Sequence, residues 1–326
     1  MNDWRIFQKN QPPHNGIHKL PEPPKWRQFD REGDEHKAAT FQPREKDIDA
    51  VNIALYLRRP LLVTGEPGSG KTSLIYAVAR QLQLGQVLRW NITTRTTLQD
   101  GLYRYDAIAR LQDAQVRQMQ GKSTSETEDI GKYIMLGPLG TAFLPSEIPR
   151  ALLIDEIDKS DIDLPNDLLH IFEEGSYEID ELVRWQQEQK ERQPAVTVRT
   201  AYTDENERAA INGGRVCCTQ FPFVVMTSNG ERDFPPAFLR RCIRLDMGKP
   251  TQEELEAIVD AHLQGLGEEK RQQAYRVIEQ FLQKREREQV ATDQLLNAVY
   301  LLTRDRVPAD KQEQLQEVLL RALNER

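Results

Sequence analysis

The chain has 326 residues, which is enough for a full hydrophobic core and for two domains with a tail. Its net charge of −7 gives no global electrostatic support for binding nucleic acid. No apolar run approaches the roughly 18 residues that span a membrane, and the start of the chain lacks a signal-peptide pattern. Three cysteines are too few for a disulfide framework, so we expect a cytoplasmic protein without membrane contact.

Residues 1–40 form a proline-rich segment without sustained periodicity. Such a composition predicts an extended or disordered chain. Trp4 and Trp26 suggest that the segment lies along a folded surface, because a solvated linker has little use for tryptophan. The alternative is a flexible tail that makes no contact with the folded part of the chain.

A glycine-rich loop between a strand and a helix is the strongest signal in the sequence. Residues 45–57 have the apolar spacing of a helix, and the stretch PLLVTGEPGSGKT follows at 60–72. The spacing G-x-x-x-x-G-K-T lets several backbone N–H groups turn toward a triphosphate, and the next helix adds its dipole. Lys71 would reach the β- and γ-phosphates, and the Thr72 hydroxyl would take one position on Mg²⁺. The candidate nucleotide ligands are Gly65, Glu66, Pro67, Gly68, Ser69, Gly70, Lys71, Thr72 and Ser73.

The next strong element is a carboxylate pair at the end of a buried strand. Residues 74–82 predict a helix and 86–91 a strand, whereas 93–135 are polar, with a hairpin or helix at 103–111 and a flexible charged stretch at 122–129. The stretch ALLIDEID at 151–158 then reads as a parallel strand. Asp155 suits Mg²⁺ and Glu156 suits proton abstraction from water, although a helix cap is the structural alternative.

The remaining elements complete the predicted sheet and add a helical region. Residues 177–215 are polar, and the turn Asn212-Gly213-Gly214 suggests a hairpin. A buried strand at 221–227 delivers Asn229 to the edge that carries Asp155, where its amide can orient water. A short helix from Pro235 ends at Arg240-Arg241, and a last strand covers 243–247. From residue 251 onward, four apolar stripes predict a small four-helix domain.

In this order, the motifs GEPGSGKT, LLIDE, VVMTSN and PPAFLRR resemble those of the AAA+ ATPases, most closely the MoxR-type group, over about residues 36–326. The resemblance implies an α/β P-loop NTPase fold, with a parallel sheet flanked by helices and a C-terminal all-α lid domain. It implies ATP and Mg²⁺ as cofactors, Asn229 as sensor 1, and Arg241 as the arginine finger, with Arg240 as the alternative. Asn91 takes the glutamate-switch place, and residues 137–140 resemble the group's GP-containing stretch.

The expected domains are an N-terminal segment at 1–40, an AAA+ domain at 41–249 with insertions near 93–135 and 177–215, and a lid domain at 250–326. One departure is that Asp293 or Gln294 stands where the family has its sensor-2 arginine. No N-K-x-D signature occurs, which favours ATP over GTP.

Three functions compete on this pattern. The main expectation is a ring ATPase, a homo-hexamer, that remodels a protein client. The stretch DEID also resembles a helicase motif, but about 80 residues of lid are too few for a second motor domain, and no basic patch interleaved with aromatics occurs. A nucleotide switch without turnover is opposed by Glu156.

Overall fold

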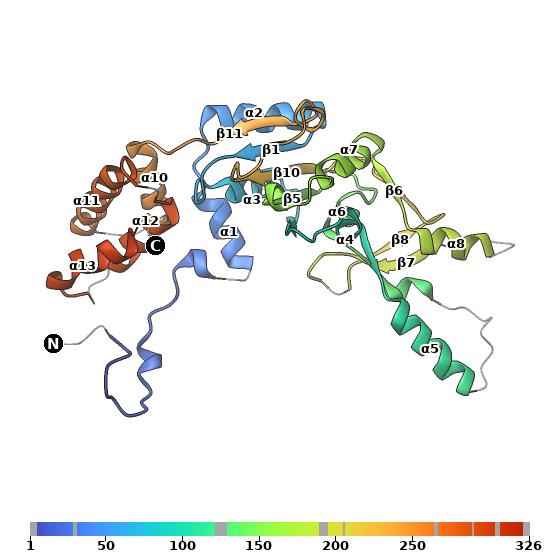
Figure 1. Cartoon of the computed structure of the whole chain (residues 1–326), viewed down its shortest axis with the longest axis horizontal. Helices are drawn as coiled ribbons and strands as arrows, with labels where there is room; N and C mark the ends of the chain where they lie inside the picture. The colour runs from blue at the N-terminus through green and yellow to red at the C-terminus, as the bar shows by residue number, and fades with distance from the viewer. Residues whose placement is uncertain are drawn as a thin grey trace. The chain divides into compact units, whose positions relative to one another are not determined.

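The computed structural model describes residues 5–28, 31–120, 129–188, 195–204, 206–263, 267–288, 290–303 and 307–321. The chain divides into two compact units (Figure 1). What we call the sheet unit comprises Arg44–Thr64 and Val78–Asp246. The lid unit comprises Met1–Pro43, Gly65–Ala77 and Met247–Arg326, so the glycine-rich loop clusters with the C-terminal helices.

The sheet unit is built on five parallel strands, in the order β11-β1-β10-β5-β2. Each strand lies in a stretch that was predicted to be a strand, with small changes at its ends. Parallel pairing brings their carboxyl ends to one edge, where Thr64 pairs with Ser228 and Asn91 with Asp155. The strands are β1 (Leu61–Thr64), β2 (Leu88–Asn91), β5 (Ala151–Asp155), β10 (Phe223–Ser228) and β11 (Ile243–Asp246).

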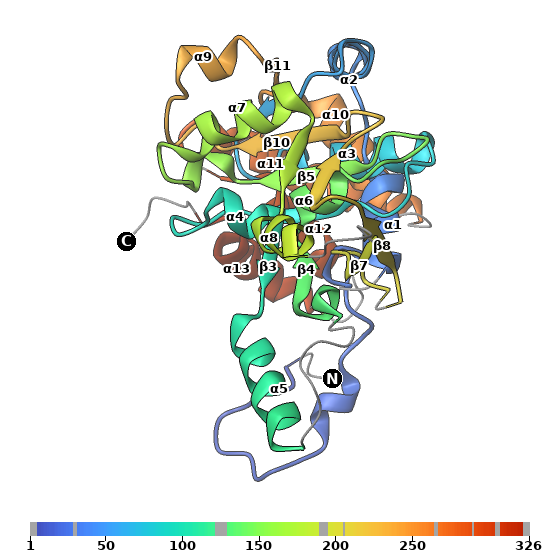
Figure 2. The ribbon, with the colours of Figure 1, turned by 90° about the vertical axis from the view of Figure 1, so that its right-hand side faces the viewer.

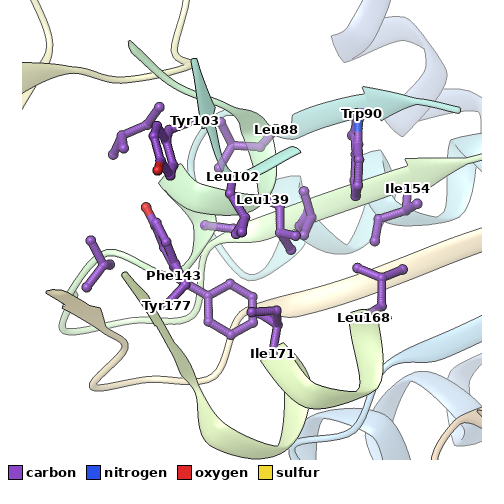
Figure 3. Close-up of a cluster of buried hydrophobic side chains, with 14 of the residues drawn as sticks. Leu88, Trp90, Leu102, Tyr103, Leu139, Phe143, Ile154, Leu168, Ile171 and Tyr177 are labelled. Atoms are coloured by element: carbon purple, nitrogen blue, oxygen red, sulfur yellow. The ribbon is translucent and has the colours of Figure 1, made fainter. Parts of the chain in front are cut away.

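Short helices cover this sheet and enclose its hydrophobic core. Phe143 and Tyr177 lie among leucine and isoleucine side chains from several elements (Figure 3). A Cβ on Gly140 would lie 2.0 Å from the carbonyl oxygen of Leu102, so this glycine permits a close backbone approach that no other residue allows. The helices are α2 (Glu45–Leu57), α4 (Leu98–Leu102), α6 (Pro138–Ala142), α7 (Leu164–Glu174) and α9 (Pro236–Leu239), and the helix α3 (Lys71–Gln81) follows β1.

A second sheet extends the sheet unit in the order β3-β4-β7-β8, and β6 pairs with β9. The hairpin expected at Asn212-Gly213-Gly214 is wrong: β7 and β8 turn at 200–207, whereas the glycine turn leads from β8 to β9 in a different sheet. Gly213 and Gly214 both have positive φ, which lets the chain change sheets. The strands are β3 (Tyr103–Tyr105), β4 (Ile134–Leu136), β6 (Ser176–Glu178), β7 (Val196–Arg199), β8 (Arg208–Ile211) and β9 (Arg215–Cys217), and α8 (Asp180–Glu188) lies between β6 and β7 in sequence.

The polar region after β2 contains the helix α5 (Ala107–Met119), followed by the turn η3 (Ile130–Tyr133). Of the hairpin or helix expected at 103–111, the helix is present from Ala107, whereas the strand before it, β3, pairs with β4 some 30 residues later and forms no local hairpin. Figures 1 and 2 show α5 extending away from the sheets of its own unit. Of the charged stretch expected at 122–129, residues 122–128 lie outside the described residues.

The lid unit contains the four C-terminal helices that the apolar stripes predicted. Their core includes Leu255, Phe281 and Leu295, all fully buried. Within the described ranges, none of the helices has the length and apolar character needed to cross a membrane. The helices are α10 (Gln252–His262), α11 (Glu268–Arg285), α12 (Thr292–Leu302) and α13 (Ala309–Leu319).

The N-terminal segment is more ordered than its composition suggested. Residues 16–19 and 25–27 form the 3-10 turns η1 (Gly16–Lys19) and η2 (Lys25–Arg27), and α1 (Arg31–Thr40) is helical where extended chain was expected. Acidic residues in its first turn complement the helix dipole. Trp26 donates to Asn297 Oδ1 at 3.2 Å and meets Tyr300 edge-on, so the expectation that this segment lies along a folded surface is confirmed for Trp26.

A histidine pair joins α1 to α10 within the lid unit. His36 Nε2 lies 3.1 Å from His262 Nδ1, and Trp26 packs edge-on against His262. Burial lowers the pKa of His262 to about 4. Burial and the charge of Lys25 lower the pKa of His36 as well.

We expect acid to weaken this packing. The unfolded chain protonates His262 near pH 6.5, whereas the folded chain does so only near pH 4, so unfolding takes up a proton as the pH falls between these values. This histidine should therefore lower the free energy of unfolding by up to about 1.4 kcal/mol per pH unit across that window. Urea unfolding at pH 7 and pH 5 measures the loss, and His262→Gln should reduce it. An equal loss in this variant would contradict the assignment.

Candidate functional site

The glycine-rich loop leaves the end of β1 and enters α3 at Lys71. Gly65, Gly68 and Gly70 have φ values of 153°, 77° and 88°, which residues other than glycine rarely adopt. Lys71 is only 7% exposed, and its Nζ donates to the carbonyl oxygens of Gly65 and Glu66 at 2.7 and 2.8 Å. The loop is therefore already curled around the ammonium group that was predicted to bind phosphate.

The remaining loop residues fit a bound polar ligand. The hydroxyl of Ser69 is buried and makes no hydrogen bond within the described residues, so a polar group of a ligand would satisfy it. The N-terminus of α3 directly follows the loop, and the dipole of a helix favours an anion at this end. Ser73 and Thr72 are half-buried in the first turn of α3, Pro67 is exposed, and Glu66 forms an ion pair with Lys249 at 3.0 Å.

Within the lid unit, the start of α12 lies beside the glycine-rich loop. A Cβ on Gly68 would lie 3.1 Å from the backbone nitrogen of Asp293, at the start of α12. The Gln294 side chain instead makes hydrogen bonds within the C-terminal helices. Its Oε1 accepts from the Ala291 N–H at 2.8 Å, and its Nε2 donates to the carbonyl oxygen of Arg321. Of the two residues predicted for this place, Asp293 is therefore the one beside the loop.

The carboxylate pair lies at the carboxyl edge of the sheet. Asp155 ends β5, and its side chain is 10% exposed. The Thr227 hydroxyl donates to Asp155 Oδ1 at 2.7 Å, and Arg89 Nη2 lies 2.7 Å from Oδ2. The sequence interpretation missed both partners, because they reach Asp155 only through the order of the strands in the sheet.

Glu156 directly follows β5 in an unusual backbone conformation. Its φ of 62° and ψ of 47° are left-handed, which is rare for a residue with a side chain and typical of functional positions. The N–H of Glu156 donates to Thr227 Oγ1 at 2.9 Å, so the same hydroxyl fixes both carboxylate residues. The Glu156 side chain is half-exposed and pairs with Lys159 Nζ at 2.8 Å, at the end of the turn η4 (Ile157–Lys159). This hydrogen bond raises the pKa of Lys159.

Asn229 follows β10 and reaches the same edge as predicted. Buried Asp158 holds its backbone, because Oδ2 accepts from the N–H groups of Asn229 at 2.9 Å and Glu231 at 3.1 Å. The fourth residue of DEID is thus a positioning residue that the motif alone did not reveal. It ties the segment after β5 to the segment after β10.

Arg240 and Arg241 do not join these residues. Both precede β11, whose first residue Ile243 donates its N–H to Pro60 at the amino edge of the sheet. Four strand residues, roughly 13 Å, separate that edge from the carboxylates. Arg241 pairs with Glu173 and donates to Ala237 O at 3.2 Å. Arg240 is exposed, and among the described residues no side-chain hydrogen bond or ion pair engages its guanidinium.

Comparison with known proteins agrees with this geometry. The family described as the AAA domain, dynein-related subfamily, matches residues 60–242, which is more than half of the chain. The search among curated proteins gave no match. The matched range begins at the strand before the phosphate loop and ends just after the two arginines. The chain therefore belongs to the dynein-related subfamily of AAA domains.

Proposed function

We propose that this protein is a Mg²⁺-dependent ATPase of the MoxR type, acting in the cytoplasm as a homo-hexameric ring. Two observations carry the proposal: the glycine-rich loop is curled around Lys71, and one threonine fixes both Asp155 and Glu156 at the edge of the parallel sheet. AAA domains generally hydrolyse nucleotides, and this chain keeps a carboxylate suited to act as the base.

The chemistry of the oxygen donors fits Mg²⁺. Thr72 offers a hydroxyl and Asp155 a carboxylate, and both are the hard oxygen ligands that this ion prefers. When bound, the ion would neutralise charge on the phosphates. Lys71 would hold the β- and γ-phosphates, Asn229 would orient the attacking water, and Glu156 would accept its proton. An arginine of the neighbouring subunit would complete the site, since Arg240 and Arg241 lie at the opposite sheet edge.

We propose a protein client, because α5 presents a surface of unusual polarity. Its polar residues face its own unit: Arg110 donates to the Tyr105 hydroxyl at 2.9 Å, and Asp113 accepts from Lys132 and Tyr133. The opposite face is exposed and carries four large apolar side chains beside Gln112 and Gln115, whereas an ordinary surface helix turns its apolar residues inward. Its residues are Ile108, Leu111, Val116 and Met119, exposed by 71, 61, 51 and 87%.

The second polar region, at 177–215, is less suited to a test of client binding. Val198 and Ile211 of the β7–β8 hairpin belong to the hydrophobic core of the sheet unit. Replacing residues 197–214 by a short link would therefore disturb folding together with any client contact. Helix α5 buries no residue of its own, so its exposed face can be changed without removing core.

We expect the double variant Leu111→Gln, Met119→Gln to lose most of the binding of an unfolded polypeptide, with basal ATPase activity retained. The probe is fluorescently labelled casein, and binding in ATP is followed by anisotropy. Gln112→Ala and Gln115→Ala on the same exposed face serve as the matched control. Full casein binding by the double variant would exclude this face. Many-fold, salt-sensitive stimulation of the parent ATPase by single-stranded DNA would favour a nucleic-acid motor instead.

A further inference from the structure

Arg89 is a charged residue of β2 that no motif singles out. Leu88 and Trp90 point into the core, so Arg89 and Asn91 share the opposite face of the strand. Parallel pairing of Asn91 with Asp155 places that face beside the metal-binding carboxylate. From two residues earlier on β2, the Arg89 guanidinium reaches forward to Asp155 Oδ2 at 2.7 Å.

The two partners of this ion pair differ in their freedom to move. The Asp155 side chain is 10% exposed and Thr227 fixes its other oxygen, whereas the Arg89 side chain is 43% exposed. The backbone remains tied independently, because the Ile92 N–H donates to the Asp155 carbonyl oxygen at 3.0 Å. The guanidinium can therefore swing into water while the strand and the carboxylate keep their places.

A guanidinium and a divalent cation compete for the same negative charge. Their mutual repulsion at contact distance opposes simultaneous binding to one carboxylate, and a charge-assisted hydrogen bond must be broken before Oδ2 is available. Because the Arg89 side chain is 43% exposed, water screens this pair and its contribution to stability is small, so support of the sheet edge is a poor explanation for an arginine at this place.

We propose that Arg89 is a counter-cation of Asp155, which must release the carboxylate before Asp155 can serve Mg²⁺. The inference rests on the role proposed above for Asp155. Its consequence is that Arg89 lowers the affinity of the site for the metal. Arg89 is thus a positioning residue that acts through Asp155.

The test measures how strongly Mg²⁺ assists nucleotide binding, without any turnover. The dissociation constant of a fluorescent, non-hydrolysable ATP analogue is determined in EDTA and in excess Mg²⁺. The value in EDTA divided by the value in Mg²⁺ is then compared among variants. Arg89→Met should raise this ratio about threefold to tenfold, the range expected for losing one charge-assisted contact. Arg89→Lys, which keeps the charge, should stay near the parent.

Arg244→Met is the matched control, since it removes an exposed arginine from β11 at the other edge of the same sheet. Its ratio should not change. Asp155→Asn separates the two proposals: if it leaves the ratio unchanged, Asp155 does not serve the metal and the proposed site is wrong. If Asp155→Asn lowers the ratio but Arg89→Met leaves it unchanged or lowers it, Arg89 does not compete. Urea midpoints verify folding, and Arg89→Gln replaces Arg89→Met if that variant unfolds.

Discussion

Glu156→Gln is expected to bind ATP as the parent does and to lose about 10²- to 10⁴-fold in kcat, the usual contribution of a general base. The amide keeps the size of the side chain but accepts a proton far less readily than a carboxylate. The backbone bond from the Glu156 N–H to Thr227 does not involve the side chain, so the local structure should survive. Binding of a fluorescent ATP analogue and steady-state phosphate release measure the two quantities separately.

Two comparisons define the role of this carboxylate. Lys71→Ala should lose nucleotide binding itself, because the buried ammonium holds the loop carbonyls as well as the phosphates. Glu174→Gln, a change of an exposed carboxylate on α7, should leave both binding and turnover near the parent values. If Glu156→Gln released phosphate at the parent rate, Glu156 would not be the base, and the carboxylate pair would have to be read as a structural cap.

The sequence predicted the phosphate loop and the parallel strands because both depend on local patterns. Glycine spacing, apolar runs and the residues directly after them lie within a few positions of one another. Asp155, Glu156 and Asn229 could be placed at one edge for the same reason, since parallel strands share their carboxyl ends. The four helices of the lid unit follow equally from their apolar spacing.

The contacts that hold the side chains of the site could not be predicted from the sequence, because they depend on which strands become neighbours. Arg89 and Thr227 flank Asp155 only through the order β10-β5-β2, which no local pattern specifies. Asp158 had no predicted role, and its hydrogen bonds run to the segment after β10.

Two local expectations also failed for physical reasons. The proline content of the N-terminal segment concealed α1, which packs its His36 against the lid. The turn at Asn212-Gly213-Gly214 has the residues of a tight hairpin, but positive φ values serve equally well for a change of sheet. The local sequence therefore specifies a turn, but the pairing of the strands determines whether that turn closes a hairpin or leads into another sheet.

Loss of the arginine that acts across the proposed ring should lower kcat about 10³- to 10⁵-fold, the range known for such arginines. Arg241 was the first candidate, but its guanidinium is held by Glu173 within the same chain. We therefore expect Arg240→Ala to have the larger effect on turnover, since Arg240 is exposed and lies far from its own carboxylates. Arg241→Ala should lower turnover less. Its pair with Glu173 is partly exposed, so Arg241→Ala and Glu173→Gln should each lower the free energy of unfolding by at most about 1 kcal/mol, which urea unfolding measures.

Mixing inactive variants tests whether the arginine acts on a neighbouring subunit. Arg240→Ala and Glu156→Gln each disable every site when alone, but a mixed ring contains interfaces at which an intact Arg240 meets an intact Glu156. Turnover should therefore reappear on mixing and peak near equal amounts of the two chains. The same experiment with Arg241→Ala identifies which arginine is needed. Absence of recovery in both mixtures, or full activity of a monomeric parent at every concentration, would show that the site is completed within one chain.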